Sequence, residues 1–436
     1  MNKSEPISQL IRYSAVGMPI AFVGLPLYIH APDFYATHTG LSLGLMGIIL
    51  LGLRMVDAIQ DPIIGMLSDK YHSKRPVVMV VASIFLVLGF VMLFVPPQHY
   101  TPLWFAGCMF VTTTCFSILT INLHSTGATA AKTYHDKTLF ASWREAFAIV
   151  GLLLAVVLPT VLSQAMPLQE AFLLIGAIIA LLFIPSLLLH VRWFLKQDFH
   201  FQQLIQKAFQ LPPMSPRTKG LYALYGLVMV SSSLSAVVVL FYIRQKIDAE
   251  DLAGLFLGFY FLSAIAGMAL WHRVSKRASK EKAWLMAMII GVLSFMWATF
   301  LGPNDLYVYG IICVISGIAF GADLVMPHSI LADHIAEKQQ QALATTYYGL
   351  LAFIAKLAFA LASVMAFGVL DAVGFSANGQ NTSTAIITLG VVYAGVPCLL
   401  KLIASAVLWF QMKRYTTGEI YEKSLSTTTI RSHHHV

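Results

Sequence analysis

The chain has 436 residues, of which 58% are hydrophobic and only 11% are charged. Soluble domains carry about 25% charged residues, so this composition excludes an ordinary soluble protein and indicates a polytopic membrane protein. The net charge of +8 comes from basic residues that cluster in loops between apolar segments, where they set topology at a membrane surface. We therefore expect contact with membrane lipid, no nucleic-acid partner, and a multi-pass location in a cell membrane, for a bacterium the inner membrane.

Twelve apolar segments are long enough to cross a bilayer, which requires about 20 residues per helix. They are 9–31, 42–67, 77–95, 103–128, 139–164, 168–193, 221–244, 252–274, 283–301, 306–331, 344–370 and 383–411. The first has the length of a spanning helix and no small-residue cleavage site, so we expect no removable signal peptide. The predicted fold class is an all-α membrane protein whose twelve transmembrane helices form two six-helix halves.

The longest polar connection separates the sixth segment from the seventh. We predict an N-terminal six-helix bundle over 1–194, a cytoplasmic linker over 195–220, a C-terminal six-helix bundle over 221–411 and a cytoplasmic tail over 412–436. The linker begins with the alternating pattern of an interfacial helix and is broken by LPPMSP. Basic residues concentrate in the even-numbered loops, so both termini are expected in the cytoplasm.

The second segment carries two carboxylates. Asp57 and Asp61 are four residues apart and share one helix face with Arg54. Two carboxylates this close cannot easily both remain ionised and unpaired at low dielectric. Either a cation such as Na⁺ lies between them, or one holds a proton, or Arg54 neutralises one. Because acids inside a membrane usually serve function, we predict a coupling-ion site at these two aspartates, which are metal ligands if the ion is Na⁺.

The loop after this segment contains a candidate gate. Its residues are Gly65, Leu67, Asp69, Lys70, Lys74 and Arg75. They resemble the loop 2–3 signature of the major facilitator superfamily, Gly-x-Leu-x-Asp-Arg-x-x-x-(Lys/Arg)-Arg. The glycine permits close helix contact, and the acid with the basic cluster can form a salt bridge that breaks as the halves rock. The gate residues are thus predicted to be Gly65, Asp69, Lys70 and Arg75. In the second half, Trp271 replaces the acid.

The fourth segment offers neutral oxygens and one titratable group, at Thr113, Thr120, Asn122 and His124. Each of these side chains could contact a solute or could bond to a neighbouring helix instead. Tyr28, at the outer end of the first segment, is a candidate solute contact or part of an interfacial cluster.

Several charges lie within apolar segments and need partners. Lys356 could pair with Asp57 or Asp61 across the halves, whereas Arg144 could extend to the lipid headgroups. Asp323 could pair with Lys401 or Lys356. Asp333 lies near the cytoplasmic end, where we expect a gate role with the basic loops.

The stretch 124–147, HSTGATAAKTYHDKTLFASWREAF, carries a more specific resemblance. It is similar to the pattern Gly-Ala-Glu-…-Asp-Tyr-His-Glu-Arg-Thr-…-Trp-Arg-Glu-Ala-Phe of the glycoside–pentoside–hexuronide:cation symporters, the melibiose-permease family. The matching residues are Gly127, Ala128, Tyr134, His135, Thr138, Trp143, Arg144, Glu145, Ala146 and Phe147. The stretches RMVDAIQDPIIGMLSDK, 317–335 and 347–361 agree with the same family.

This resemblance implies a symporter in which Na⁺, H⁺ or Li⁺ binds at the helix-two acids and drives uptake of a sugar or related solute. By position, Asp57 and Asp61 become the cation ligands, Arg144 the substrate-facing arginine, and Lys356 the lysine that links the cation and substrate sites. Asn122 and Tyr28 complete the expected substrate contacts. No cofactor beyond the coupling ion is expected, and the monomer is expected to be the functional unit.

The chain also departs from the melibiose permease, which has substrate-gripping acids in helices one and four. Here helix one has no acid before Asp33, Thr120 or Asn122 stands at the helix-four position, and Thr129 replaces the acid of Gly-Ala-Glu. The acids that bind the galactoside in the melibiose permease are therefore missing from this chain.

The expected function is cation-coupled (Na⁺ or H⁺) symport of a small polar solute, a sugar or glycoside first, by alternating access. The alternative is a lysophospholipid or other lipid-like solute, which a eukaryotic branch resembling this family transports. A prenyltransferase-type enzyme is not expected, because such enzymes carry two Asp-x-x-x-Asp motifs, whereas Asp323 and Asp333 in the second half are ten residues apart. The sequence contains no Gly-x-x-x-x-Gly-Lys-Ser/Thr loop for ATP.

Overall fold

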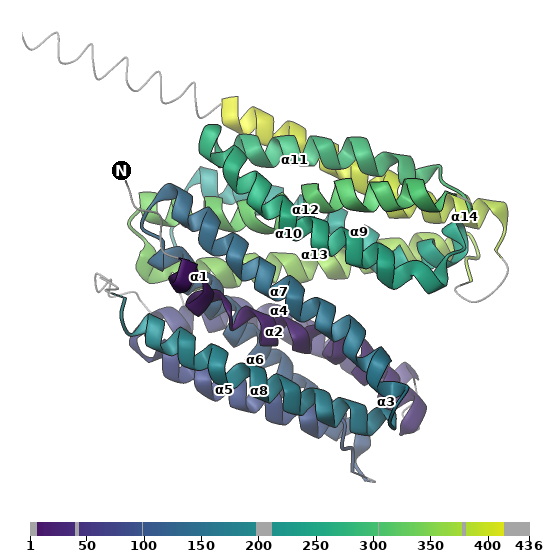
Figure 1. The fold of residues 1–436 in the computed structure, drawn as a ribbon, viewed down its shortest axis with the longest axis horizontal. Helices are drawn as coiled ribbons and strands as arrows, with labels where there is room; N and C mark the ends of the chain where they lie inside the picture. Colours follow the sequence, from purple (N-terminus) through teal and green to yellow (C-terminus); the bar gives the residue numbers. More distant parts are fainter. Residues whose placement is uncertain are drawn as a thin grey trace, which may run out of the picture.

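A computed structural model describes residues 7–39, 43–97, 99–197, 212–303, 305–376 and 381–413, and within these ranges all regular structure is helical. Figure 1 shows α1 to α8 in one bundle and α9 to α14 in a second bundle beside it. The elements of the first are α1 (Ile7–Ser14), α2 (Gly17–Leu25), η1 (Pro26–His30), α3 (Ala31–His38), α4 (Leu43–Lys70), η2 (His72–Lys74), α5 (Arg75–Leu93), α6 (Thr101–Ala130), α7 (Tyr134–Ser163) and α8 (Leu168–Phe194).

The elements of the second bundle are α9 (Pro216–Phe241), η3 (Tyr242–Ile247), η4 (Glu250–Leu252), α10 (Ala253–Arg277), α11 (Lys280–Phe295), η5 (Met296–Thr299), α12 (Leu306–Glu337), η6 (Gln341–Leu343), α13 (Ala344–Ala372), α14 (Ser383–Gly390) and η7 (Val391–Gly395). The last span runs on as far as Lys413. We call these two bundles the N-half and the C-half.

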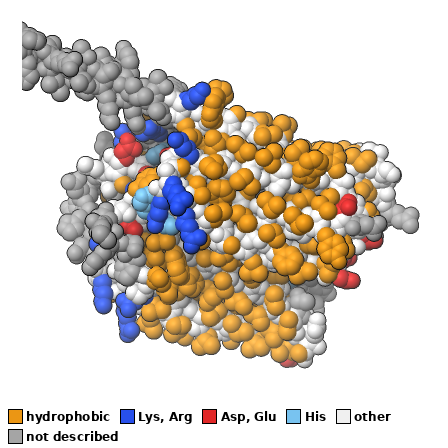
Figure 2. Space-filling model, turned by 45° about the horizontal axis from the view of Figure 1, so that its top comes forward, with side chains coloured by type: hydrophobic (Ala, Val, Ile, Leu, Met, Phe, Trp, Pro, Cys, Tyr) orange, Lys and Arg blue, Asp and Glu red, His pale blue; other side chains and the backbone are white. Residues whose placement is uncertain are grey.

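Eleven helical spans among the described residues are long and apolar enough to cross a membrane. The twelfth is α4, whose 28 residues extend about 42 Å at 1.5 Å per residue. Helices suit this environment because they satisfy their own backbone hydrogen bonds where no water is present. Figure 2 shows apolar side chains over most of the visible face, with Lys, Arg and His gathered toward one end. We call this the basic end, defined by the turns at 70–75, 131–133 and 277–280.

Two predicted boundaries differ from the structure. The span expected over 9–31 is interrupted after α1 and again at the π-helical segment η1, which begins at Pro26. Pro26 has no amide hydrogen to donate, and from this residue the helix continues in π-helical form. Helix α9 begins inside the expected linker, because Ser215 caps it by accepting a hydrogen bond from the Thr218 amide. Most of the expected linker, 198–211, and the tail from 414 lie outside the described residues.

The two halves meet where α4 packs against α13, and where α7 packs against α10 and α12. Two glycines allow α4 and α13 to approach backbone to backbone. A Cβ atom on Gly65 would lie 2.6 Å from the Thr345 carbonyl oxygen, and one on Gly349 would lie 2.5 Å from the Asp61 carbonyl oxygen. Each helix thus contacts the other's backbone through a position where only glycine fits. This contact sets the register that brings the charged residues of α4 and α13 together.

Candidate coupling site and gate

The predicted acid pair forms a buried cluster with a lysine of the opposite half. The Lys356 ammonium, on α13, lies 2.9 Å from Asp57 Oδ1 and 2.8 Å from Asp61 Oδ2. The two aspartates are 2% and 0% exposed. Lys356 also donates a hydrogen bond of 2.8 Å to the Ser117 hydroxyl on α6. With all three groups charged, the cluster carries a net charge of −1, and a proton or a monovalent cation would neutralise it.

Neutral oxygens extend this cluster on the side of Asp57. Gln60 donates to Asp57 Oδ1 at 2.9 Å, and Thr114 of α6 donates to the Gln60 side-chain oxygen at 3.0 Å. Asp57 Oδ2 is buried and has no hydrogen-bond partner among the described residues. Since a buried polar atom is normally paired, this free carboxylate oxygen is suited to an additional ligand such as a cation or a proton.

Arg54 does not neutralise the pair. Its guanidinium carbon lies 4.5 Å from the Tyr28 ring centroid and 5.6 Å from that of Phe359, in cation–π contacts. Of the possible partners suggested by the sequence, Lys356 therefore forms ion pairs with both Asp57 and Asp61. Tyr28 is half-buried on the first span, with its ring edge-on to Phe116 at 6.4 Å.

The other two expected substrate residues are engaged within the N-half. Arg144 is 3% exposed and does not extend to the surface; its guanidinium binds Glu145 Oε1 through Nε and Nη2, at 3.0 and 2.6 Å. Asn122 donates to the Ile118 carbonyl at 2.8 Å and accepts from the Ser68 hydroxyl. Its amide is thus used inside the N-half in this conformation, the structural alternative considered for helix four.

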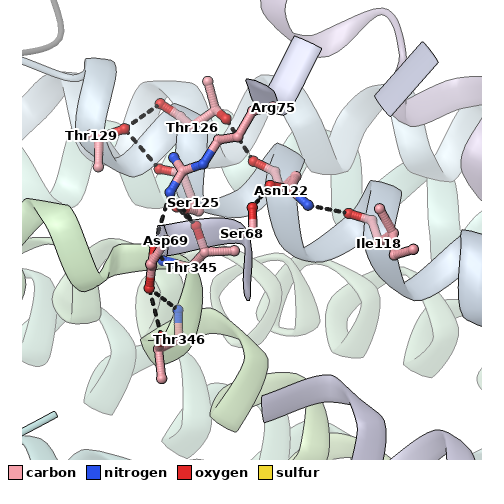
Figure 3. A network of polar contacts seen from close by, with 10 residues as sticks. All are labelled: Ser68, Asp69, Arg75, Ile118, Asn122, Ser125, Thr126, Thr129, Thr345 and Thr346. Atoms are coloured by element: carbon pink, nitrogen blue, oxygen red, sulfur yellow. Dashed lines mark hydrogen bonds and ion pairs between the residues drawn. The ribbon is translucent and has the colours of Figure 1, made fainter. Parts of the chain in front are cut away.

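At the basic end, Asp69 binds the start of α13, as Figure 3 shows. Its carboxylate accepts hydrogen bonds from the Thr345 amide at 2.9 Å and from the Thr346 amide and hydroxyl at 2.7 and 2.6 Å. The N-cap position of α13 is Leu343, which supplies no side-chain cap. The first amides of a helix need acceptors, and the positive helix end favours an anion. A carboxylate of the N-half therefore caps a helix of the C-half.

Arg75 completes this network and is itself buried, with 1% exposure. It pairs with Asp69 at 2.8 Å and donates to the Thr345 hydroxyl, which also bonds Ser125 of α6 at 2.8 Å (Figure 3). Lys70, the fourth residue of the predicted gate, is exposed, and its ammonium lies 5.5 Å from the Tyr71 ring. The contact between the halves thus contains Gly65, Asp69 and Arg75 but not Lys70.

A second ion-pair cluster joins the halves at the same end. Asp333 of α12 lies 2.9 Å from the Lys137 ammonium on α7 and 2.6 Å from the Lys280 ammonium on α11. Nearby, the hydroxyls of Thr138 and Ser329 are 2.8 Å apart. Because Lys137 belongs to the N-half and Asp333 to the C-half, this pair also has to separate if the basic end opens.

The C-half has a further buried ion pair. Asp323 lies 2.6 Å from the Lys401 ammonium and accepts a hydrogen bond of 2.9 Å from the Trp284 indole. Lys401 is thus its partner rather than Lys356. Trp271, in place of the acid of the loop signature, donates to the Ile318 carbonyl at 2.7 Å. It anchors α10 to α12 within the C-half.

Several of these partners are not predicted by the sequence. Thr114 and Ser117 are three residues apart on α6, a spacing that places both on the face toward α4. Thr345 and Thr346 open the predicted span 344–370, and paired hydroxyl residues at a helix start could have suggested a polar contact there. Neither pattern indicates which helix lies opposite.

Two six-helix bundles in contact along paired helices are the major facilitator fold. Solved structures with this fold are similar across nearly the whole chain. A bacterial homologue of the iron transporter ferroportin has a TM-score of 0.70 at 14% identity, covering 93% of this chain and 99% of its own. The fucose:proton symporter FucP of E. coli has a TM-score of 0.65 at 14% identity, covering 93% and 97%. The human organic anion transporter MFSD10 has a TM-score of 0.65 at 15% identity, covering 93% and 100%.

The family of the chain is shown by its sequence relatives. The profile of the family described as "MFS/sugar transport protein" matches residues 11–413. The "Uncharacterized symporter YnaJ" of Bacillus subtilis (strain 168) is 22% identical over 398 residues, which are 85% of this chain and 84% of that protein. The chain belongs to the MFS/sugar transport protein family, which agrees with the resemblance to glycoside–pentoside–hexuronide:cation symporters. It is a multi-pass membrane transporter and not an enzyme.

Proposed function

We propose that this protein is a cation-coupled symporter, driven by Na⁺ or H⁺, that carries a small polar solute, in the first place a sugar or glycoside. The observation that supports this most is the cluster of Lys356 with Asp57 and Asp61. It contains two acids, one competing cation and a free carboxylate oxygen. The family supports a sugar as the transported class, and the symporter relative supports the symport mode. No contact in the described residues specifically favours a lipid-like solute.

The cluster provides a physical route for coupling. Lys356 belongs to the C-half, whereas both acids belong to the N-half, so the ammonium ties the halves together. A cation or proton arriving at Asp57 or Asp61 weakens the attraction to Lys356, because it neutralises charge in the same low-dielectric site. The released ammonium then becomes available to a hydroxyl of the solute. Cation occupancy thereby changes both the solute site and the contact between the halves.

The gate contacts complete the proposed cycle. Asp69 with Thr345 and Thr346, and Lys137 with Asp333, hold the basic end closed in this conformation. Alternating access requires these bonds to break as the halves rock about the central site. Following the positive-inside rule, we propose that the basic end faces the cytoplasm, in a bacterium across the inner membrane, and that the monomer transports.

Solute recognition is proposed at the centre, between Tyr28 and the Lys356 cluster, with Arg144 as a further contact. Arg54 and Tyr28 already stack there, and a half-buried aromatic ring can pack against the apolar face of a sugar. Asn122 stays a proposed contact as well: like Arg144, it is bonded within the N-half in this conformation, and both side chains would reach the solute once those bonds open. The absence of acids on helices one and four argues for a solute other than a galactoside.

The test is uptake by proteoliposomes under imposed Na⁺ or H⁺ gradients. Labelled melibiose, a glucuronide and lysophosphatidylcholine form the solute panel, each measured with and without the gradient. We expect a sugar or glycoside to accumulate only when one of the two gradients is present. Gradient-independent uptake of every accepted solute would contradict symport, and accumulation of lysophosphatidylcholine alone would contradict the sugar class.

A further inference from the structure

A second cluster of ligating side chains lies between the halves, separate from the aspartate pair. It consists of His124 on α6, Glu145 on α7 and His328 on α12, and one ligating atom of each lies within 4.8 Å of the others. The two imidazole rings are 4.8 Å apart and nearly perpendicular, at 78°. Two histidines and one carboxylate on three different helices make a ligand set typical of divalent transition metals.

The tautomer of His328 suits this role. Its Nδ1 lies 3.0 Å from the Leu324 carbonyl oxygen, which can only accept, so Nδ1 carries the hydrogen. The other ring nitrogen, Nε2, then presents its lone pair, as a metal ligand must. The ring is also held in place, since it stacks on Tyr348 at 6.1 Å. No hydrogen bond reaches the His124 ring nitrogens from the part of the chain that the structure describes, so a lone pair is available there as well.

Glu145 contributes the charge of the set. Both hydrogen bonds from Arg144 reach Oε1, and no protein donor in the described residues reaches Oε2. The two neutral imidazoles and this carboxylate alone carry a net charge of −1, which the bound Arg144 guanidinium brings to zero, and a fourth position stays open for water. Tetrahedral Zn²⁺ with bonds of about 2.1 Å places its ligands about 3.4 Å apart, so small side-chain rotations close the set around the ion. Arg144 competes with the metal for Glu145, which limits the affinity.

We propose that His124, Glu145 and His328 form a divalent transition-metal site, of the class that binds Zn²⁺, which spans the two halves. His124 and Glu145 move with the N-half and His328 with the C-half, so the three ligands meet only while the basic end is closed. A ligand that binds one conformation better shifts the population toward it. The bound metal therefore holds the basic end closed and slows transport, whichever solute is carried.

Binding is tested on the full-length purified protein in which His433, His434 and His435 are replaced by alanine, since three consecutive histidines would bind metal themselves. The probes are Zn²⁺, by titration calorimetry, and Co²⁺, whose visible absorption reports nitrogen and oxygen ligands. We expect one Zn²⁺ per chain, with affinity at least tenfold weaker in His124→Gln and in His328→Gln. His190→Gln removes a buried histidine bonded to the Tyr13 carbonyl and serves as the matched control, with unchanged affinity.

The link to conformation needs a variant that keeps all three ligands. Asp69→Asn weakens the gate and leaves His124, Glu145 and His328 intact, so it should lower the Zn²⁺ affinity because coupling between sites is reciprocal. Equal Zn²⁺ binding by the parent and both histidine variants, each monodisperse and of parental thermal stability, would overturn the site. Unchanged affinity in Asp69→Asn would overturn its dependence on the closed basic end. Neither measurement requires a known solute, so the outcome is independent of the proposed symport.

Discussion

Replacing Asp69 by asparagine tests how the basic end is held closed. The carboxylate accepts three hydrogen bonds from the start of α13 and pairs with buried Arg75. Hydrogen bonds to a charged group are worth about 1.5–3 kcal/mol, against about 0.5–1.5 kcal/mol for neutral ones. Asparagine is uncharged and keeps only one acceptor oxygen, so the bonds to the other oxygen are lost and those that remain weaken, which costs about 1 kcal/mol or more for each of the three bonds to α13. A total of about 3 kcal/mol shifts the closed-to-open equilibrium roughly 150-fold toward open.

The assay is the distance between two spin labels, one on each half near the basic end, measured in detergent or nanodiscs. We expect a single short distance in the parent and a substantial longer-distance population in Asp69→Asn. Lys70→Gln is the matched control, because Lys70 is adjacent in sequence but exposed and outside the network. An unchanged distance distribution in Asp69→Asn would refute the assignment of this contact as the gate.

Three further variants probe the interface and the buried charges. Gly349→Val places a side chain against the Asp61 carbonyl, where even a Cβ would lie 2.5 Å away, so the closed conformation should lose at least about 1–3 kcal/mol in the same distance measurement. Lys356→Gln removes the competing cation, so Na⁺ or H⁺ should bind the acid pair more tightly while solute accumulation is lost, as followed by Na⁺ titration and proton uptake. Asp323→Asn leaves Lys401 without its carboxylate and should lower the unfolding free energy by about 3–5 kcal/mol, as read from denaturation, while cation dependence of transport is retained.

The opposite result in each case identifies the faulty step. A closed population in Gly349→Val equal to that of the parent would show that the glycine contact does not set the approach of α4 to α13. Weaker cation binding in Lys356→Gln would make the lysine a necessary partner of the ion rather than its competitor. Loss of cation dependence in Asp323→Asn would show that Asp323, in the C-half, takes part in cation coupling.

The sequence predicts the spans, the acid pair and the loop signature, because these depend on hydropathy and short-range spacing. It also identifies Arg144 and Lys356 as charges that need partners inside the membrane. Which partner each one takes depends on packing between helices far apart in the chain. By sequence alone, both Arg54 and Lys356 can pair with Asp57. The backbone contact of α4 with α13 at Gly65 and Gly349 places Lys356 beside it.

Two features lie beyond sequence patterns of this kind. The acceptor for the first amides of α13 comes from Asp69, 276 residues away from Thr345, so no local capping pattern predicts it. The grouping of His124, Glu145 and His328 requires three helices from both halves. Conversely, hydropathy predicts one continuous first span, whereas Pro26 begins a π-helical segment within it.

The most direct test of the central claim compares two transport modes in Asp61→Asn, with Asp323→Asn as the control that removes a buried carboxylate elsewhere. One mode is accumulation of the accepted solute in proteoliposomes under an imposed Na⁺ or H⁺ gradient. The other is solute exchange at equilibrium, which needs the fold and the solute site but no driving gradient. We predict that Asp61→Asn retains exchange and loses accumulation, while Asp323→Asn retains both. Gradient-driven accumulation by Asp61→Asn at the level of the parent would contradict a coupling site at the aspartate pair.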